Sequence, residues 1–549
     1  MTHSDKFKLT AGIRLEIPYY PSIDGNVNNE FQNGWNEILY DSLGYEYGFL
    51  HHAIADGSNT LSGLSTADMP QPREDFSPRL GFEWDFMGNR KLILRGGSGL
   101  YTGRLPLVWI VTAVCNSNVA QGTYITYNTP MAFYSSVEEI IANNSDKLKI
   151  GDMPAPQIAT LLDKNLHLPQ SWKSSLTLDA HLPGDIHGTL EGIFSKDLSS
   201  VAITRLGIIQ DDSIQLPGEH QKRAHWTSEG IVNSIGGKVT PYLVTNSDQN
   251  GYYYALTGQL SKQFRFGLNL MAAYTYSSGK NVIDGIGDQI MTAFSTNTFG
   301  IHGSNSHELG YSSYVSPNRV LLNAGWTWAT GQHTTETIGL YYEGYNLCYV
   351  GSYSYNRYSY TMVTNSIKSS TGVESTMNLN GDEGASSLLY IPNDDELAAM
   401  SFADVRDKNG NVIQTADENR QAFKEFIKND KYLRTHQGMY AERGGAIAPW
   451  WHTINFKYER TYKFHDGEAL SFGVDVRNIA NLLYRGWGNV KRLSTSDILK
   501  YGYAFTGQDE KGINQYTNEK YYIFMNPTWN EYPSTQSTWS AALNVRFDF

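Results

Sequence analysis

The last eleven residues of the chain alternate strictly between two kinds of side chain and end on an aromatic residue. One face holds Trp539, Ala541, Leu543, Val545, Phe547 and Phe549, and the other holds Ser540, Ala542, Asn544, Arg546 and Asp548. A period of two is typical of a β-strand whose two faces meet different surroundings. A soluble sheet with one face on a core would give the same pattern. The interpretation therefore depends on how often the pattern recurs, and at what length.

The same alternation recurs along the chain at the length of a bilayer-spanning strand, about 9–11 residues. We predict strands near 6–17, 79–88, 90–102, 173–183, 186–197, 199–208, 251–263, 264–277, 317–330, 333–345, 450–463, 468–478 and 537–549, with a weaker pair at 497–505 and 519–526. Their polar faces carry small and charged residues, which suit a wet lumen and would be costly against lipid. The predicted fold is all-β: a transmembrane antiparallel up-and-down β-barrel with about 14–16 strands in this chain.

The connections between these strands fall into two classes. Short turns lie near 86–90, 183–185, 261–264 and 465–467, and long connections span 18–78, 104–172, 209–250, 278–316, 346–449 and 479–536. Barrels of this kind keep short turns on the periplasmic side and long loops on the extracellular side. Two long loops carry helical patterns, at 135–144 and 417–430. Loops of this length are usually functional or folded back as a cap.

Composition fits such a barrel and excludes other classes of protein. Tyr (37 residues) and Gly (51) are frequent, and only 40% of residues are hydrophobic. The longest apolar run, residues 105–115, is too short for a membrane helix and contains Pro106. A net charge of −12 argues against nucleic acid. Cys115 and Cys348 could form one disulfide, but without a spacing motif two unrelated residues are the favoured interpretation.

Several phrases follow one another along nearly the whole chain. They are residues 76–82, 94–109, 250–262, 273–285, 388–392, 448–450 and 476–482 with 487–488, followed by the terminal aromatic strand. In this order they resemble the C-terminal barrel of TonB-dependent outer-membrane receptors, specifically the SusC and Oar-like branch. The resemblance implies a plugged barrel of about 22 strands in the outer membrane of a Gram-negative cell. It also implies energised binding and import of a large solute, such as an oligosaccharide or a peptide.

The resemblance implies further parts that the sequence does not show: a signal peptide, an N-terminal β-sandwich, a TonB box and a plug. We therefore expect residues 1–549 to form a partial receptor barrel, with 6–17 as a mid-barrel strand. We expect an open or strained wall, in which the two terminal strands are unpaired or forced together. The implied partners are outer-membrane lipid, the TonB complex acting through a plug outside this chain, the outer-membrane assembly machinery and, as a further candidate, a surface lipoprotein. No cofactor is implied.

Tyrosines crowd one predicted hairpin and its loop. Because Tyr pairs a flat apolar ring with a hydroxyl, it suits stacking on sugars or gripping peptides. An interfacial aromatic girdle accounts for Tyr341 or Tyr342. The remaining candidate ligand contacts are Tyr345, Tyr349, Tyr353, Tyr355, Tyr358 and Tyr360. At the C-terminus, Phe547 and Phe549 resemble the signal that the assembly machinery recognises; the alternative is that they are simply lipid-facing residues.

Catalysis has little support in the sequence. No G-x-S-x-G elbow or comparable spacing occurs, so we expect no enzyme, no catalytic residue and no metal site. Residues 380–384 offer acidic oxygen atoms in a loop, but they lack the EF-hand pattern, which leaves calcium as a minor alternative. Two other functions stay open: a surface binding or adhesion protein built on a barrel, and a passive pore. The strand pattern indicates which residues face lipid, but it does not identify a substrate.

Overall fold

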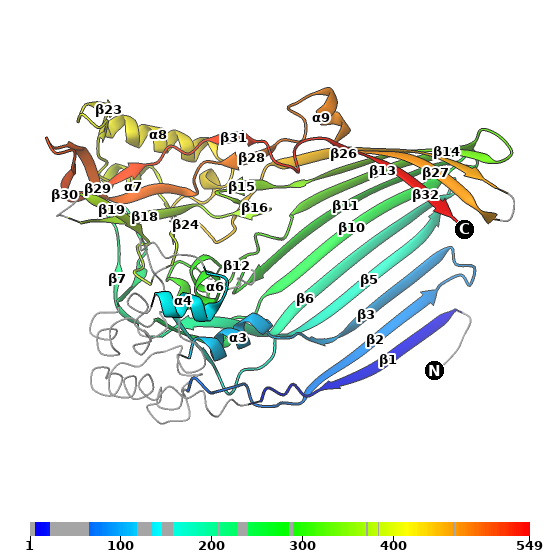
Figure 1. Cartoon of the computed structure of the whole chain (residues 1–549), viewed down its shortest axis with the longest axis horizontal. Coiled ribbons are helices and arrows are strands. Elements are labelled where there is room, and N and C mark those ends of the chain that lie inside the picture. Colours follow the sequence, from blue (N-terminus) through cyan, green and yellow to red (C-terminus); the bar gives the residue numbers. More distant parts are fainter. Residues whose placement is uncertain are drawn as a thin grey trace.

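A curved wall of antiparallel strands dominates the molecule (Figure 1). The computed structural model describes residues 6–21, 65–117, 134–144, 158–206, 208–227, 240–284, 289–297, 299–368, 372–382, 384–464 and 467–549. Twelve strands pair in one linear order: β1 (Phe7–Glu16), β2 (Asp75–Asp85), β3 (Leu92–Thr102), β5 (Gln170–Leu182), β6 (Ile186–Arg205), β10 (Tyr252–Gln263), β11 (Leu268–Asn281), β13 (Asn318–Ala329), β14 (Thr334–Asn346), β26 (Trp450–Lys463), β27 (Ala469–Arg477) and β32 (Ser540–Asp548).

The all-β transmembrane fold predicted from the alternation is confirmed, and the strand count is corrected. The predicted strands 186–197 and 199–208 correspond to a single strand of 20 residues, β6, which ends at Arg205; residue 207 lies outside the described residues. The weaker pair forms β29 (Asp497–Gln508) and β30 (Asn514–Phe524), which pair with each other in a separate sheet outside the wall. The other predicted strands all lie in the wall. In the part of the chain that the structure describes, β1 pairs only with β2 and β32 only with β27.

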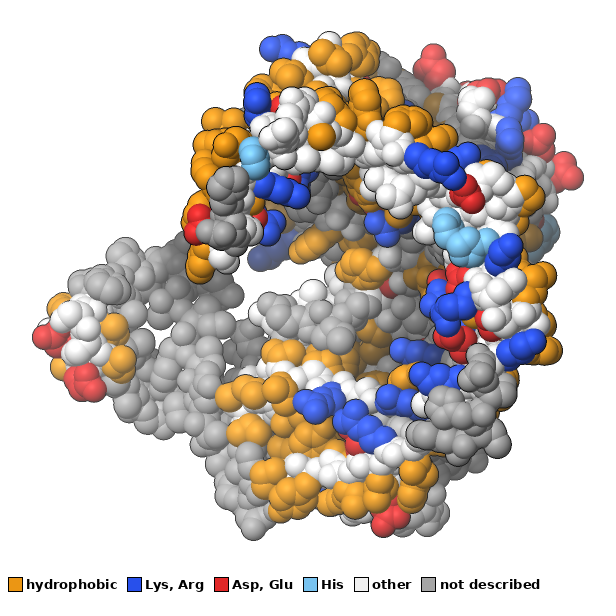
Figure 2. Space-filling model, turned by 90° about the vertical axis from the view of Figure 1, so that its right-hand side faces the viewer, with side chains coloured by type: hydrophobic (Ala, Val, Ile, Leu, Met, Phe, Trp, Pro, Cys, Tyr) orange, Lys and Arg blue, Asp and Glu red, His pale blue; other side chains and the backbone are white. Residues whose placement is uncertain are grey.

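Large apolar side chains cover one face of the wall. Leu80, Leu176, Leu256, Leu322 and Val545 are between 44% and 69% exposed, although they lie within paired strands. A water-soluble protein would bury such a belt, whereas lipid solvates it. Figure 2, seen from the end with the short turns, shows hydrophobic side chains along the outer edge of the wall and a hollow beside its inner face.

Aromatic rings mark both ends of this apolar belt. At the short-turn end, Trp84 lies 4.1 Å from Phe86 and Trp326 lies 4.5 Å from Trp328, measured between ring centroids. At the opposite end, Tyr254 lies 6.3 Å from Tyr276. Such girdles sit at the two membrane–water interfaces.

The long connections fold into an ordered region at the opposite end from the short turns. In its first half lie α3 (Leu107–Cys115), α4 (Val137–Asn143), β4 (Ile158–Leu162), β7 (Ile209–Ile214), β8 (Arg223–Thr227), β9 (Thr240–Ser247), α6 (Ile290–Asn297), η4 (Ser304–Ser306) and β12 (Gly310–Tyr311). In its second half lie β15 (Cys348–Val350), β16 (Tyr353–Tyr355), β17 (Arg357–Tyr358), β18 (Thr361–Lys368), β19 (Val373–Met377), β20 (Ser387–Leu388), β21 (Tyr390–Ile391), α7 (Asp394–Ala399), β22 (Val405–Arg406), β23 (Val412–Gln414), α8 (Ala416–Asn429), η5 (Leu433–Thr435), β24 (Met439–Tyr440), β25 (Ala446–Ile447), α9 (Ile479–Leu483), β28 (Val490–Leu493) and β31 (Trp529–Tyr532).

The two largest hydrophobic cores of the described residues hold this extracellular region together. One core joins Leu216, Tyr360, Phe423, Leu499 and Tyr522. The other packs α3, β4, β9 and α6 around residues such as Trp109 and Phe294. The long loops therefore pack on one another and form an ordered extracellular region.

Both predicted helices of the long loops are present, as α4 and α8. Helix α8 begins with a capping box, in which Thr415 and Glu418 satisfy each other's backbone N–H groups. Its Phe423 and Ile427 side chains are buried. Among the described residues, no helix has both the length and the apolar character needed to cross a membrane. Cys115 and Cys348 are both free thiols, so the interpretation as two unrelated residues is confirmed.

Candidate ligand-binding lumen and its mouth

A row of mostly polar residues crosses ten neighbouring strands on the inner face of the wall. Residues directly opposite each other in paired strands share a face. The inner row, followed from strand to strand, is Lys8, Glu83, Arg95, Thr177, Glu191, Thr257, Thr275, Arg319, Tyr345 and Trp451. The neighbouring outer row holds Leu9, Phe82, Gly96, Leu176, Gly192, Leu256 and Tyr276. Successive residues of each strand therefore face the lumen and the lipid in turn.

Charges of both signs are paired along the inner face. Arg95 Nε lies 3.0 Å from Asp179 Oδ2, and the Thr177 hydroxyl donates to Glu191 at 3.1 Å. Arg319 donates two hydrogen bonds to Glu343, at 3.0 and 2.5 Å. A polar surface of this kind can exchange hydrogen bonds with a hydroxyl-rich or amide-rich solute, or with a protein segment inside the lumen.

Two hollows indent this inner face. The larger, of about 500 Å³, is lined by residues that include Lys8, Glu83, Arg95, Ser175 and Glu191. The smaller, of about 380 Å³, is lined by residues that include Asn323, Tyr341, Asn455, Lys457, Asp475 and Arg477. The smaller hollow adds an aromatic ring to amide and charged groups, the combination that recognises sugars and peptides.

An aromatic strip continues from the inner row into the extracellular region. Tyr345 meets Trp451 edge to face, with ring centroids 5.1 Å apart. Beyond it, Tyr349 lies 4.8 Å from Tyr532, and the Arg492 guanidinium lies 5.1 Å above the Tyr532 ring. We call Tyr345, Tyr349, Trp451, Arg492 and Tyr532 the mouth strip. Trp451 is only 8% exposed and packs with Leu347 and Val490, so it supports the strip from below. The other rings and the Arg492 guanidinium are the members that can stack on a ligand.

The structure separates the six candidate tyrosines into three groups. Tyr345 and Tyr349 belong to the mouth strip and are half-buried. Tyr353 is 71% exposed at the tip of the β15–β16 hairpin, and burial raises the pKa of Tyr355 beside it to about 12. Ligand contact by these four residues stays a prediction.

The other two tyrosines are core residues, which corrects their assignment as ligand contacts. Tyr358 and Tyr360 are only 6% and 1% exposed. Their hydroxyls lie 3.0 Å apart, and Tyr360 donates to Asp430 at 2.8 Å. Burial raises the pKa of both phenols. A ring needs an open face to stack on a ligand, and these rings are covered by the packing of the extracellular region.

Sequence reasoning missed three members of the mouth strip. Trp451 was inside a predicted strand but was not recognised as inward-facing, because it lies next to outward-facing Trp450. Arg492 and Tyr532 lie on β28 and β31, strands of four residues each. Such short strands show too little alternation to be detected, so only the three-dimensional pairing of β15 with β28 and of β28 with β31 reveals them.

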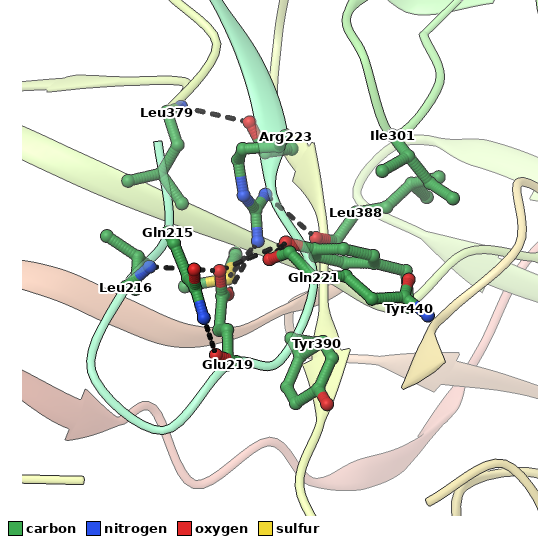
Figure 3. A network of polar contacts seen from close by, with 12 residues as sticks. Gln215, Leu216, Glu219, Gln221, Arg223, Ile301, Leu379, Leu388, Tyr390 and Tyr440 are labelled. Atoms are coloured by element: carbon green, nitrogen blue, oxygen red, sulfur yellow. Dashed lines mark hydrogen bonds and ion pairs between the residues drawn. The ribbon is translucent and has the colours of Figure 1, made fainter. Parts of the chain in front are cut away.

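A buried polar network fixes the β7–β8 hairpin to the extracellular core (Figure 3). Arg223 is fully buried and donates to Glu219 at 2.8 Å and to the Leu388 carbonyl at 3.1 Å. Its guanidinium lies 4.7 Å from the centre of the Tyr440 ring, and the Tyr440 hydroxyl donates to Glu219 at 3.0 Å. The paired charges therefore fix the β7–β8 connection to β20 and β24 within the extracellular region.

The acidic loop at 380–384 is also organised from within. Asp382 is fully buried. Its carboxylate accepts hydrogen bonds from the backbone of Ser304 at 2.5 Å and of Gly384 at 3.1 Å, and from the Asn378 amide. Asp382 is therefore a structural residue of this loop, and Glu383 lies outside the described residues.

The two C-terminal aromatic residues lie at the short-turn end of the wall. Phe547 is half exposed and Phe549 fully exposed. The Phe547 ring lies 6.4 Å from Phe464 and 6.3 Å from Phe549. They extend the aromatic girdle at this end, and their role in assembly stays a prediction.

Comparison with known proteins places this geometry in a family. No curated protein matches the chain. The outer membrane transporter YddB from Escherichia coli is similar over 86% of this chain and 41% of its own, with 9% identity and a TM-score of 0.36. A mutant of the ferric enterobactin receptor PfeA from Pseudomonas aeruginosa is similar over 88% of this chain and 42% of its own, with 10% identity and a TM-score of 0.33.

The chain therefore spans less than half the length of these solved structures. The match to a family model is far more extensive, because it covers residues 3–490. With this match and the observed wall of strands, the chain belongs to the outer membrane beta barrel domain family, and its place is the outer membrane of a Gram-negative cell.

Proposed function

We propose that this chain forms part of the barrel of a TonB-dependent transport receptor of the SusC and Oar-like branch. In this proposal it binds a large solute, an oligosaccharide or a peptide, and takes part in its import. The observation that carries the proposal is the continuity between the mouth strip and the polar inner row, since Tyr345 and Trp451 belong to both. A solute that stacks on the mouth strip would then be able to form hydrogen bonds with the polar residues of the inner row.

The proposal includes partners beyond the chain. Energy would come from the TonB complex acting on a plug domain, and the polar inner face would contact that plug between transport events. Phe547 and Phe549 would be read by the assembly machinery. A surface lipoprotein would be a further partner, at the extracellular region.

Uptake by cells that carry the full-length gene product tests the transport role. We expect Tyr345→Ala and Tyr349→Ala each to weaken uptake of the solute, because each removes a stacking ring from the mouth strip. Tyr516→Ala is the matched control, since Tyr516 lies on β30, outside the strip, and is also half-buried. Equal uptake by all three variants would contradict a ligand role for the mouth strip. Absence of a plug and a TonB box from the full-length gene would remove the transport proposal itself.

A surface binding protein is the second candidate, because the extracellular region has its own hydrophobic cores. A passive pore is the third. Single-channel recording of the full-length gene product in planar bilayers separates them: a plugged receptor should be nearly silent, and an open pore should conduct steadily. A binding protein would retain the solute at the cell surface without accumulation inside.

A further inference from the structure

The segment between β27 and β28 carries exposed apolar side chains at the extracellular end of the wall. Leu482, Leu483 and Tyr484 are 49%, 83% and 70% exposed. They lie at the end of α9 and directly after it, and the exposed Arg485 follows. Figure 1 shows α9 projecting from the wall beside β26. We call residues 482–485 the α9 tip.

Three tryptophans place this segment on the outer side of the wall. Trp450 and His452 lie on the same face of β26. His452 is opposite Gly344, and Gly344 is opposite Val320, so this face is the outer face of the wall. The His452 ring lies 5.9 Å from Trp450 and 6.2 Å from Trp487, the residue that closes the α9 segment. Trp539 precedes the outward-facing residues of β32 and is 45% exposed. The α9 tip is thus continuous with the outer aromatic girdle.

Hydrogen bonds hold the segment in this position. Asn478, fully buried at its start, donates its backbone N–H to Asn455 at 2.9 Å and its side-chain amide to the Ser537 carbonyl at 2.7 Å. The Asn481 amide donates to the carbonyls of Arg485 and Trp487 at 2.9 and 2.8 Å. These bonds hold the backbone of the segment in a position in which both leucines are exposed.

We propose that the α9 tip is an interfacial anchor that inserts into the outer leaflet of the membrane. Leu482 and Leu483 enter the acyl region, Tyr484 lies at headgroup level and Arg485 pairs with a lipid phosphate. The occupant is lipid because the tip continues the lipid-facing surface of the wall, and because the order apolar, aromatic, cationic matches the polarity gradient of a bilayer interface. This inference rests on the membrane wall and not on the proposed transport function.

Depth-dependent fluorescence quenching tests the anchor. The full-length gene product carries Cys115→Ser, while buried Cys348, whose thiol pKa burial raises to about 12, stays in place. A polarity-sensitive fluorophore is then attached to Leu483→Cys in phosphatidylcholine vesicles with brominated acyl chains. Ile413→Cys is the matched control: Ile413 is 66% exposed but lies on β23 in the extracellular region. Leu322→Cys, on the outer face of β13, reports that the wall itself has inserted.

We expect bromine to reduce fluorescence at position 483 by about twofold or more, most strongly when it lies near the headgroups, as for a segment about 5–10 Å deep. Position 413 should be unaffected, and position 322 should be quenched most by bromine deep in the chains. Quenching at 322 without quenching at 483 would overturn the proposal in an inserted protein. A signal at 483 that depends on protein density and not on bromine would assign the tip to a second copy and would also overturn it.

The phosphate contact has its own test. Adding phosphatidylglycerol should increase quenching at position 483 in the parent protein, since a cation near an anionic surface is attracted to it. The increase should be lost in Arg485→Gln and retained in Arg406→Gln, a change in the extracellular region on β22. An equal increase in both variants would overturn the assignment of Arg485 to a lipid phosphate.

Discussion

Leu322 and Asn323 are consecutive residues of β13 that face different media. Leu322 lies opposite Ala272 and Tyr342 on the outer face and is 44% exposed. Asn323 lies opposite Tyr341 and lines the smaller lumen hollow. Because successive side chains of a strand point to opposite sides, one position along the chain decides between lipid and water.

This contrast gives the first prediction. Leu322→Arg should lower the free energy of unfolding by about 2–4 kcal/mol, the cost of a charge near the bilayer midplane. Asn323→Arg should change it by less than about 1 kcal/mol, because the lumen solvates the charge. Urea titration of the full-length gene product in vesicles, followed by tryptophan fluorescence, measures both. Equal losses would contradict the assignment of the two faces.

Two glycines on the outer face give the second prediction. A Cβ at Gly258 would meet no atom within 4 Å, whereas a Cβ at Gly96 would come within 2.8 Å of the Ser175 carbonyl oxygen. Gly258→Ala should therefore raise the free energy of unfolding by about 0.5–1 kcal/mol, because it removes backbone freedom from the unfolded chain. Gly96→Ala should lower it. The same urea titration decides, and a loss of stability in both variants would show that Gly258 is needed for another reason.

The alternation in the sequence was sufficient to predict which residues of a strand share a face. It predicted the first residue of each strand less accurately. The sequence predicts a strand from 264, whereas β11 begins at Leu268. Residues 264–267 form the turn, closed by a hydrogen bond from Gly267 N–H to the Phe264 carbonyl at 3.0 Å. Gly267 has φ +93°. Phe264 and Phe266 continue the alternation into the turn, where their ring centroids lie 5.4 Å apart in the aromatic girdle.

At the scale of elements, β6 shows why pattern reasoning divides one strand into two. Its first part lies in the membrane wall between β5 and β10. Its last part pairs with β9, and Ala202, Ile203, Thr204 and Arg205 are all buried. A strand covered on both faces loses its alternation. Because the alternation stops where β6 leaves the membrane wall, the sequence predicts two strands in place of one.

Elements of the extracellular region were predictable only where local signals are strong. Helix α8 has an N-terminal capping box and an apolar stripe, so its sequence alone reveals it. The mouth strip depends instead on contacts between residues far apart in sequence, such as Tyr349 and Tyr532. Of the six candidate tyrosines, Tyr358 and Tyr360 are core residues, and ligand contact by the other four stays a prediction.

The Glu219–Arg223 pair gives the third prediction, at the β7–β8 hairpin. Arg223→Met should lower the free energy of unfolding by about 3–5 kcal/mol, because it leaves the Glu219 carboxylate buried without its cation. The double variant Glu219→Gln with Arg223→Met should recover part of this loss, since no unpaired charge remains. Protease protection of the extracellular region reports the change. A double variant as unstable as the single one would show that packing, and not charge, dominates the network.

The fourth prediction concerns His307, which joins the loop after η4 to β6. Its Nε2 lies 3.1 Å from the Thr204 hydroxyl and 3.2 Å from the Ile203 carbonyl, and burial lowers its pKa to about 4. The unfolded residue, with a pKa of about 6.5, binds its proton first as pH falls. Stability from the neutral ring is therefore complete above pH about 6.5 and lost toward pH 4, by on the order of 1 kcal/mol per pH unit.

A matched variant isolates this titration. His307 has φ +51°, a backbone region that Asn tolerates well. His307→Asn should lower the stability of the extracellular region at neutral pH and flatten its decline between pH 6.5 and 4. Protease protection measured across this range gives both quantities. An unchanged slope in the variant would assign the acid sensitivity to other groups.

For the whole molecule, the decisive feature is the pair of strands that end the linear order. Nearly every residue of β1 and β32 is exposed, whereas β10 pairs on both sides, with β6 and β11. An edge strand directs alternate backbone N–H groups away from its only neighbour. In lipid, each such unsatisfied group costs several kcal/mol. We therefore predict that the outer edges of β1 and β32, which have no partner among the described strands, pair with further strands in a bilayer.

Hydrogen exchange on the 549-residue chain alone therefore provides the last prediction. Amides of β1 and β32 should exchange much faster than those of β10, with the fast positions alternating along each strand. The chain alone should also give no compact, SDS-resistant band on an unheated gel, because heat-modifiable migration requires a closed wall. Slow exchange in β1 and β32, together with such a band, would show that the two edges close on each other and that the chain needs no further strands. Fast exchange in β10 as well would show that the chain had not folded, and the measurement would then be repeated on the full-length gene product, where β1 and β32 should become as protected as β10.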